Sequence, residues 1–168
     1  MRALFLSFAV LTLVSFDSFP NQESDEKEQV NRTLDAWHKA AAEANAKAYF
    51  GMMAEDAVFI GTDPTENWDL KAFKEFAKPY FDRGKAWDFK AIERHVYIDK
   101  SGKLAWFDEL LNTEMKICRG SGVLVKTGNE WKIKHYVLSI TIPNANIKEV
   151  VKIIDPIEDA LLQKAQNK

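Results

Sequence analysis

The feature that most constrains the fold is a stretch of period-two hydrophobicity that begins near Phe89. Apolar and polar residues alternate along residues 89–98, 104–114, 117–126 and 130–142. Such alternation places successive side chains on opposite faces of a β-strand. The connections between the four segments are short, two of them contain Gly with Ser or Asn, and the third is Met115-Lys116. Consecutive strands must therefore run antiparallel. The sequence therefore predicts a four-stranded antiparallel meander.

The residues outside this stretch have the period of helices. Residues 30–51 predict one long helix, because apolar side chains recur every three or four positions: Val30, Leu34, Trp37, Ala41, Ala44, Ala48 and Met52. A short apolar strand is expected at residues 57–60, and Asp69 is the expected N-cap of a second helix. Residues 147–162 form a last amphipathic segment, in which Pro156 is expected to produce a kink or to start another helix.

Helices that precede an antiparallel meander are typical of an α+β domain. A long curled sheet wrapped on helices does not close completely, so we expect a cone-shaped cavity on its concave face. Tyr136, Leu138 and Ile140 are assigned to the opposite face, which would then be too apolar for full exposure to water. We expect a homodimer through this outer sheet face, or else a cover formed by the C-terminal segment.

The N-terminus is typical of an exported protein. Arg2 precedes an apolar run that ends near Phe16, which is too short for a transmembrane helix and has the length of a signal-peptide core. We therefore expect a periplasmic or secreted protein, with an uncleaved membrane anchor as the alternative. The expected divisions are a signal peptide at residues 1–20, a linker at 21–29, a domain at 30–143 and a C-terminal helical extension at 144–168.

Composition argues against several classes of partner. The formal net charge is −2, the pI is about 6.0 and no basic stripe is present, so nucleic acid is not an expected partner. The three histidines, His38, His95 and His135, lack metal-ligand spacing, and Cys118 is the only cysteine, so we expect neither a metal site nor a disulfide. With no glycine-rich phosphate loop, no cofactor is expected.

Four motifs resemble those of a known family: GTDPxExW at residues 61–68, AWFD at 105–108, RGSGVL at 119–124 and WKIKHxxxS at 131–139. They are similar to SnoaL-like domains of the nuclear transport factor 2-like superfamily, over roughly residues 30–143. The resemblance implies a cone-shaped fold with a small-molecule pocket. It does not imply one reaction, because the superfamily includes isomerases, cyclases, dehydratases, kinase association domains and proteins with no known reaction.

Arg119 and His135 are the first candidate site residues. Arg119 shares a strand side with Ser121 and two valines, and we expect it to point into the cone beside an acidic partner (Glu66, Asp108 or Glu109). It would either bind an anionic ligand group or form a structural ion pair. His135 is assigned to the apolar side of the last strand with Ser139, as a core residue or as an acid/base group.

The carboxylates of Asp108 and Glu109 lie on opposite faces of one strand, so only one can enter the cavity. If Trp106 faces inward, Asp108 does so too; if Phe107 does, Glu109 enters. A carboxylate held among aromatic rings such as Trp106, Trp68 and Phe59 would have a raised pKa and could act as a base.

Trp68, close to Glu66, is interpreted either as a lid above the cavity or as a core residue. Trp37, His38 and Tyr49 are expected on the opposite wall. Two functions remain open: a small-molecule binding protein whose ligand is anionic, or a cofactor-independent isomerase, cyclase or dehydratase. The expected ligand-binding residues are Arg119, His135, Trp68, Glu66, Trp106, Ser121, Ser139 and Phe59, and the candidates for catalysis are Asp108, Glu109 and His135.

Overall fold

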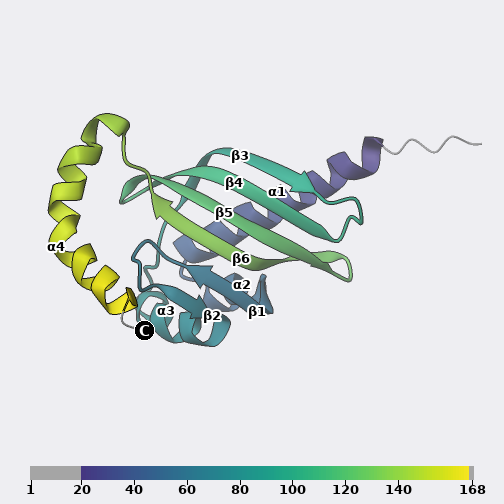
Figure 1. The fold of residues 1–168 in the computed structure, drawn as a ribbon. Helices are drawn as coiled ribbons and strands as arrows, with labels where there is room; N and C mark the ends of the chain where they lie inside the picture. Colours follow the sequence, from purple (N-terminus) through teal and green to yellow (C-terminus); the bar gives the residue numbers. More distant parts are fainter. Residues whose placement is uncertain (1–19, 167–168) are drawn as a thin grey trace, which may run out of the picture.

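The computed structural model describes residues 20–166 and shows an α+β fold in which a curled, open sheet packs on helices (Figure 1). The elements, in chain order, are α1 (Pro20–Ala42), α2 (Ala46–Gly51), β1 (Met53–Ile60), β2 (Asn67–Asp69), α3 (Leu70–Asp82), β3 (Lys90–Ile98), β4 (Leu104–Thr113), β5 (Lys116–Thr127), β6 (Glu130–Ile140), the 3-10 helix η1 (Asn144–Asn146) and α4 (Ile147–Gln166). The expected signal peptide lies outside the described residues apart from Pro20. None of the described helices combines the length and apolar character needed to cross a membrane.

The sheet has the predicted meander and two further strands. Its order is β2-β1-β6-β5-β4-β3, and β3 to β6 pair antiparallel as expected. β1 lies parallel to β6, with Phe59 opposite Tyr136, and β2 pairs antiparallel with β1. The expectation of four strands was therefore incomplete, because the parallel pairing joins segments distant in sequence and leaves no short-range signal.

The N-terminal helix differs from the prediction at both ends. It begins at Pro20, so residues 21–29 are helical rather than a linker. Glu26 explains this extension: its buried carboxylate accepts a hydrogen bond from Trp131 Nε1 (3.0 Å) and pairs with Lys126. The helix then stops at Ala42, because Ala44 has a φ of 51° and Asn45 caps the separate helix α2.

Helix α3 begins where the sequence predicts. The side chain of Asp69 accepts a hydrogen bond from the backbone N–H of Ala72 (2.8 Å), as an N-cap does. The helix passes through Pro79 and ends at Asp82. One face of α3 carries Phe73 and Ala77 into the core, beside β1 and β2.

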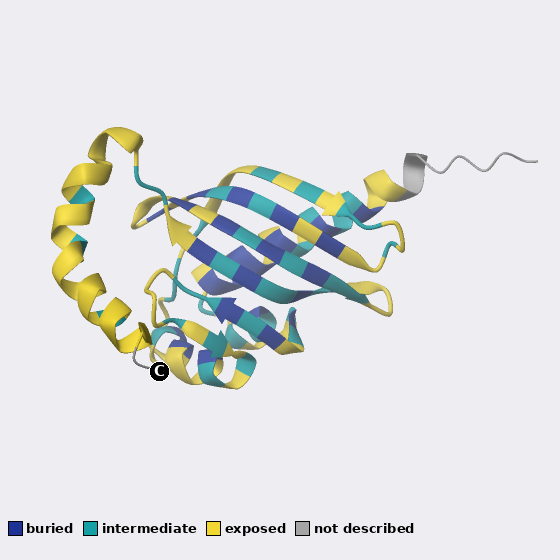
Figure 2. Ribbon diagram, in the orientation of Figure 1, coloured by how far each residue is buried: buried dark blue, intermediate teal, exposed yellow. Residues whose placement is uncertain are grey.

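Buried and less buried residues alternate along β5 (Figure 2), and the buried side is the opposite of the one expected. Cys118, Gly120, Gly122 and Leu124 are buried, whereas Arg119 and the residues that alternate with it face outward. Glycine adds no hydropathy, so the pattern favoured the valine side. The two glycines instead leave room for large rings opposite, since a Cβ on Gly120 would lie 2.4 Å from the Tyr136 hydroxyl.

In β6 a bulge changes the phase of the alternation. Val123 pairs with His135 while Leu124 pairs with Ile133, which leaves Lys134 as the extra residue. Tyr136 therefore faces inward together with Ile133 and Trp131, as does Leu138. The assignment of Tyr136, Leu138 and Ile140 to the outer face was wrong for this reason; Ile140, at the end of the strand, pairs with the inward Cys118.

Helix α4 is one helix that runs through Pro156 and buries none of its side chains completely. It leaves the end of β6 and extends beside the sheet toward α3 (Figure 1). Ile154, Ile157 and Leu161 line a shallow hollow with Pro64 and Ile140. In the described chain α4 therefore does not cover the outer sheet face, where Trp106 is 44% exposed.

Candidate functional site

A cavity of about 300 Å³ lies between α3, the β1–β2 hairpin and the inner face of the sheet. Its lining is mostly aromatic and comes from segments far apart in the chain: Phe59, Gly61, Thr62, Glu66, Trp68, Phe73, Phe76, Tyr80, Trp87, Asp88, Phe89, Thr113, Glu114, Met115 and Leu138. Phe59, Glu66 and Trp68, three of the residues selected from the sequence, are among them. The cavity is thus a concave, mostly apolar site of the kind that small molecules occupy.

The aromatic rings of the cavity form a continuous wall. Phe59 stacks on Phe73 with ring centroids 4.0 Å apart, and Trp68 stacks on Phe76 at 4.3 Å. Trp87 extends the wall, 5.8 Å from Phe73. Phe73 and Phe76 lie three residues apart on α3, so they project from one side of the helix toward the sheet. Trp68 is therefore part of a stacked cluster that also lines the cavity.

The polar lining is acidic. Glu66, Asp88 and Glu114 contribute carboxylates, and Thr62 and Thr113 contribute hydroxyls. Among the residues that the structure describes, the lining contains no Lys, Arg or His. The described cavity therefore offers no cationic side chain to an anionic ligand.

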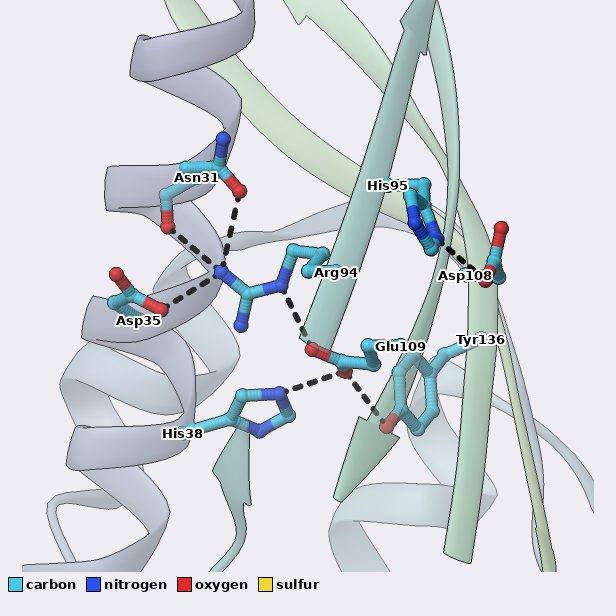
Figure 3. A network of polar contacts seen from close by, with 8 residues as sticks. All are labelled: Asn31, Asp35, His38, Arg94, His95, Asp108, Glu109 and Tyr136. Carbon is cyan, nitrogen blue, oxygen red and sulfur yellow. Dashed lines mark hydrogen bonds and ion pairs between the residues drawn. The ribbon is translucent and has the colours of Figure 1, made fainter. Parts of the chain in front are cut away.

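Glu109 is the centre of a buried polar cluster (Figure 3), which reaches the cavity through the contact between the rings of His38 and Phe89. It points inward from β4, and its side chain is fully buried. Oε1 lies 2.8 Å from His38 Nε2 and accepts a hydrogen bond from the Tyr136 hydroxyl (3.2 Å). Oε2 accepts a hydrogen bond from Arg94 Nε (2.8 Å). Because an ionised carboxylate can only accept, the contact with His38 places the imidazole proton on Nε2.

Arg94 connects this cluster to helix α1. Its side chain is only 7% exposed, although it comes from the edge strand β3. Nη1 lies 2.7 Å from the carboxylate of Asp35 and 3.4 Å from the backbone oxygen of Asn31. The guanidinium is thus paired with one buried and one exposed carboxylate. A buried charge requires such partners, because otherwise its loss of hydration is not compensated.

The surroundings keep Glu109 ionised. Burial by itself raises the pKa of this carboxyl, but the hydrogen bond from His38 and the charge of Arg94 outweigh burial and lower its pKa. The pKa of Tyr136 is raised by burial and by the adjacent negative charge of Glu109. Glu109 is thus an anion with hydrogen bonds to both carboxylate oxygens. A free carboxylate base in an apolar pocket would differ from it, because burial without such partners raises the pKa.

Comparison with known families decides what kind of domain this is. The sequence profile of the SnoaL-like domain matches residues 30–143. The chain belongs to the SnoaL-like domain family. No curated protein is significantly similar to it in sequence.

Solved structures show the same fold as this SnoaL-like domain at low sequence identity. A nuclear transport factor 2-like protein of unknown function from Pseudomonas putida KT2440 is 14% identical, with a TM-score of 0.62 over 72% of this chain and 90% of that one. A proposed scytalone dehydratase from Novosphingobium aromaticivorans is 13% identical, with a TM-score of 0.60 over 73% and 88%. The CaMKII association domain of C. elegans is 16% identical, with a TM-score of 0.58 over 71% and 98%. These similarities confirm the nuclear transport factor 2-like fold.

Several residues selected from the sequence lie outside the cavity of this SnoaL-like domain. Arg119 is exposed on the outer sheet face, opposite Leu110 and Ser139, and forms no ion pair with Glu66, Asp108 or Glu109 in the described chain. The inward orientation expected for Arg119 was therefore wrong. The residues that share its outer face are Ser121, His135, Ser139, Trp106 and Asp108.

The open choice between Asp108 and Glu109 is resolved by the structure. Phe107 and Glu109 are buried on the inner face, whereas Asp108 faces outward and lies 3.2 Å from His95 Nδ1 (Figure 3). Only Glu109 therefore reaches the interior, and Arg94 rather than Arg119 is its basic partner.

Sequence reasoning missed Arg94, Tyr136 and Trp87. Arg94 lies on the same side of β3 as Val96 and Ile98, and its burial could have been predicted from these apolar neighbours. Tyr136 was hidden by the bulge at Lys134. Trp87 lies in the segment between α3 and β3, where no periodic pattern places a side chain. His38 was expected on the helical wall, and it does face the sheet, where it contacts Glu109.

Proposed function

We propose that this SnoaL-like domain is a small-molecule binding protein whose ligand occupies the aromatic cavity. The observation that carries the proposal is the combination of a cavity of about 300 Å³ with stacked rings on its wall. Such a site gains affinity by burying apolar ligand surface, and a few polar groups orient the ligand. Glu66, whose carboxylate accepts a hydrogen bond from the backbone N–H of Asp63, supplies such a group.

The state of Glu109 supports binding rather than catalysis. A general base must come within hydrogen-bond reach of the proton that it removes. Both oxygens of Glu109 are already hydrogen-bonded, to His38, Tyr136 and Arg94, and the residue is not part of the cavity lining. The cluster therefore stabilises the inner end of the cone without offering a free base.

One observation favours the alternative, a cofactor-independent isomerase, cyclase or dehydratase. His38 forms a pair with Glu109 of the kind that orients an acid/base imidazole, and Nδ1 of His38 is buried without a hydrogen-bond partner among the described residues. The ring of His38 is 5.9 Å from that of Phe89, which lines the cavity. A shift of Phe89 would bring a ligand to this nitrogen, and His38 would then be the catalytic residue.

The binding proposal is tested with a neutral fluorescent probe, N-phenyl-1-naphthylamine, and a matched pair of tryptophan substitutions. Met115→Trp adds bulk to the cavity lining, whereas Ile153→Trp adds it to the exposed side of helix α4. We expect the wild type and I153W to bind the probe and M115W to bind it at least about tenfold more weakly, a loss of ~1.4 kcal/mol. Equal binding by all three proteins would place the ligand site elsewhere.

The two functions are separated by what co-purifies with the protein. Native mass spectrometry of the wild type and of His38→Gln should detect the same small molecule in both if the domain only binds. An enzyme would instead retain product in the wild type and substrate in the variant, so fragmentation spectra of the two molecules would differ. That difference would establish the catalytic alternative.

We further propose that the protein is a homodimer through the outer sheet face. Trp106 and Tyr97 stack there with centroids 5.6 Å apart, and Ile117, on the same face of β5, is also exposed. An apolar face of this kind on a monomer is typical of an interaction surface. Trp106→Glu should therefore lower the mass measured by sedimentation to that of a monomer; a wild-type monomer would contradict the proposal.

Export is the proposed localisation, on the strength of the N-terminal apolar run. N-terminal sequencing of the protein from its own cells should then give a mature chain that begins between about Asp17 and Lys27, given the usual length of signal peptides. Recovery of the uncleaved chain from the cytoplasm would contradict export.

A further inference from the structure

We infer that the ligand of the aromatic cavity is an organic cation, an ammonium group that carries apolar substituents. This inference rests on the proposed function, because it specifies the ligand of the same cavity. Two independent features of the lining point to it: the faces of the aromatic rings and the sign of the charged groups.

The aromatic wall is suited to a cation. Trp68, Phe73, Phe76, Tyr80 and Trp87 surround the cavity with rings whose centroids follow one another at 4.3 to 6.4 Å. The face of an aromatic ring carries negative potential, and cages of such rings bind ammonium groups with apolar substituents.

A cation of the protein itself already lies on one ring of this wall. The guanidinium of Arg83 is 4.6 Å from the centroid of Tyr80. Arg83 is exposed and is not part of the cavity lining. The ring of Tyr80 thus holds a positive charge at the surface, where water competes for it.

The charged side chains of the lining all have the sign that a cation requires. Glu66, Asp88 and Glu114 line the cavity, and no basic residue among those described does so. Asp88 and Glu114 lie 3.3 Å from the amines of Lys90 and Lys85, two lysines whose side chains are more than 70% exposed. These partners are held only weakly at the surface, so a ligand can compete with them.

Glu66 is the carboxylate most available to a ligand. It forms no ion pair with any described residue, and Oε2 accepts one hydrogen bond, from the backbone N–H of Asp63 (3.2 Å). It lies directly beside the backbone of Gly61, where a Cβ would be 2.1 Å from Oε2. Its negative charge is therefore positioned at the cavity without compensation from the protein.

The same features disfavour an anion. An anionic ligand would lose water and meet the carboxylate of Glu66, together with Asp88 and Glu114, whose lysine partners lie at the surface. The loss of its hydration without a basic side chain in the lining carries a large desolvation cost. Arg119 faces the opposite side of the sheet, and Arg94 is bound to Glu109 and Asp35. Neither arginine is part of the cavity lining.

The test uses three probes of nearly equal shape and different charge: choline, its neutral carbon isostere 3,3-dimethylbutan-1-ol, and the anion 3,3-dimethylbutanoate. Binding to the full chain is measured by calorimetry in low-salt buffer at pH 7. We expect choline to bind at least about tenfold more tightly than the alcohol, as a partly desolvated cation–π contact predicts, and the anion to bind least. Preference for the alcohol or for the anion would overturn the inference, as would the absence of binding by choline.

Neutralisation of one carboxylate provides the second arm. Glu66→Gln keeps an oxygen that can accept from Asp63 and removes the charge; Glu28→Gln, on the exposed side of α1, is the matched control. Choline affinity should fall about threefold to tenfold in E66Q, as for loss of a partly buried ion contact, and should not change in E28Q. The alcohol should bind E66Q and wild type equally. An unchanged choline affinity in E66Q would contradict the role of the carboxylate.

The two proposals fail in different ways. If the neutral probe binds the wild type and M115W weakens it, while choline shows no preference over its isostere, the cavity binds ligands but is not selective for cations. If M115W leaves the neutral probe unaffected, the cavity itself is not the binding site, and both proposals are contradicted.

Discussion

Arg94 Nε donates a hydrogen bond of 2.8 Å to Oε2 of Glu109, and this contact links the inner face of β4 to helix α1 through the edge strand. The pair is almost completely buried, and its other end is held by the exposed carboxylate of Asp35. His38 and Tyr136 occupy the remaining acceptor position of Glu109. The cluster therefore joins helix α1 to the inner face of the sheet through buried polar contacts.

Removal of the charge of Glu109 should be strongly destabilising. Glu109→Gln leaves the guanidinium of Arg94 without its buried counter-charge, which costs about 3 kcal/mol or more. Asp35→Asn removes the partner that is 66% exposed, and we expect a loss below about 1 kcal/mol. Urea denaturation followed by circular dichroism gives both free energies of unfolding. Equal losses of unfolding free energy in the two variants would show that the burial of Glu109 does not set the strength of its contribution.

Stability should also fall at acid pH through Glu109. Its pKa is lower in the folded protein than in the unfolded chain, so its contribution is fully present above the unfolded value of about 4.3 and is lost as the pH falls through the folded pKa. The free energy of unfolding of the wild type should therefore decrease below about pH 4.3 more steeply than that of Glu109→Gln. Surface carboxyls with lowered pKa values, such as Asp56 and Asp99, are present in both proteins and cancel in the comparison. Parallel curves would contradict the ionised state of Glu109.

Two glycine substitutions should have opposite effects. In Gly120→Ala the new Cβ would lie 2.4 Å from the Tyr136 hydroxyl and 2.9 Å from Glu109 Oε1, so we expect a loss of about 1–3 kcal/mol from overpacking. Nothing lies within 4 Å of a Cβ at Gly51, and its φ is not positive. Gly51→Ala should be neutral or stabilising by up to about 1 kcal/mol. Thermal unfolding of both variants measures the contrast, and a harmless G120A would mean that Tyr136 can move away freely.

Helix α4 should contribute little to the stability of the domain. It has no fully buried side chain, and the family match ends at Pro143, before the helix begins. A chain that stops after Pro143 should therefore unfold within about 1 kcal/mol of the full chain, as expected for the loss of surface contacts. The measurement is again urea denaturation of both chains at equal concentration. A larger loss would show that α4 packs against the domain or against a second copy.

The sequence by itself determined the class of the fold and its antiparallel meander. Period-two alternation and short connections leave β3 to β6 no other arrangement, and the N-cap Asp69 positions α3. Glu66 and Trp68, from one of the four motifs, are also part of the cavity lining. These features are local, because they depend on residues that are neighbours in the chain.

Only the tertiary structure decided which side of each strand faces the core. A single extra residue, Lys134, reverses the alternation in β6 and turns Tyr136 inward. In β5, Gly120 and Gly122 face the core because the rings of Tyr136 and Phe107 need their space, although valines on the other side suggest the opposite. The burial of Glu109 and its pairing with Arg94 and His38 follow from this choice of face. Hydropathy records what a side chain prefers, whereas the face that it takes depends on the volume of residues that lie opposite it and far away in the chain.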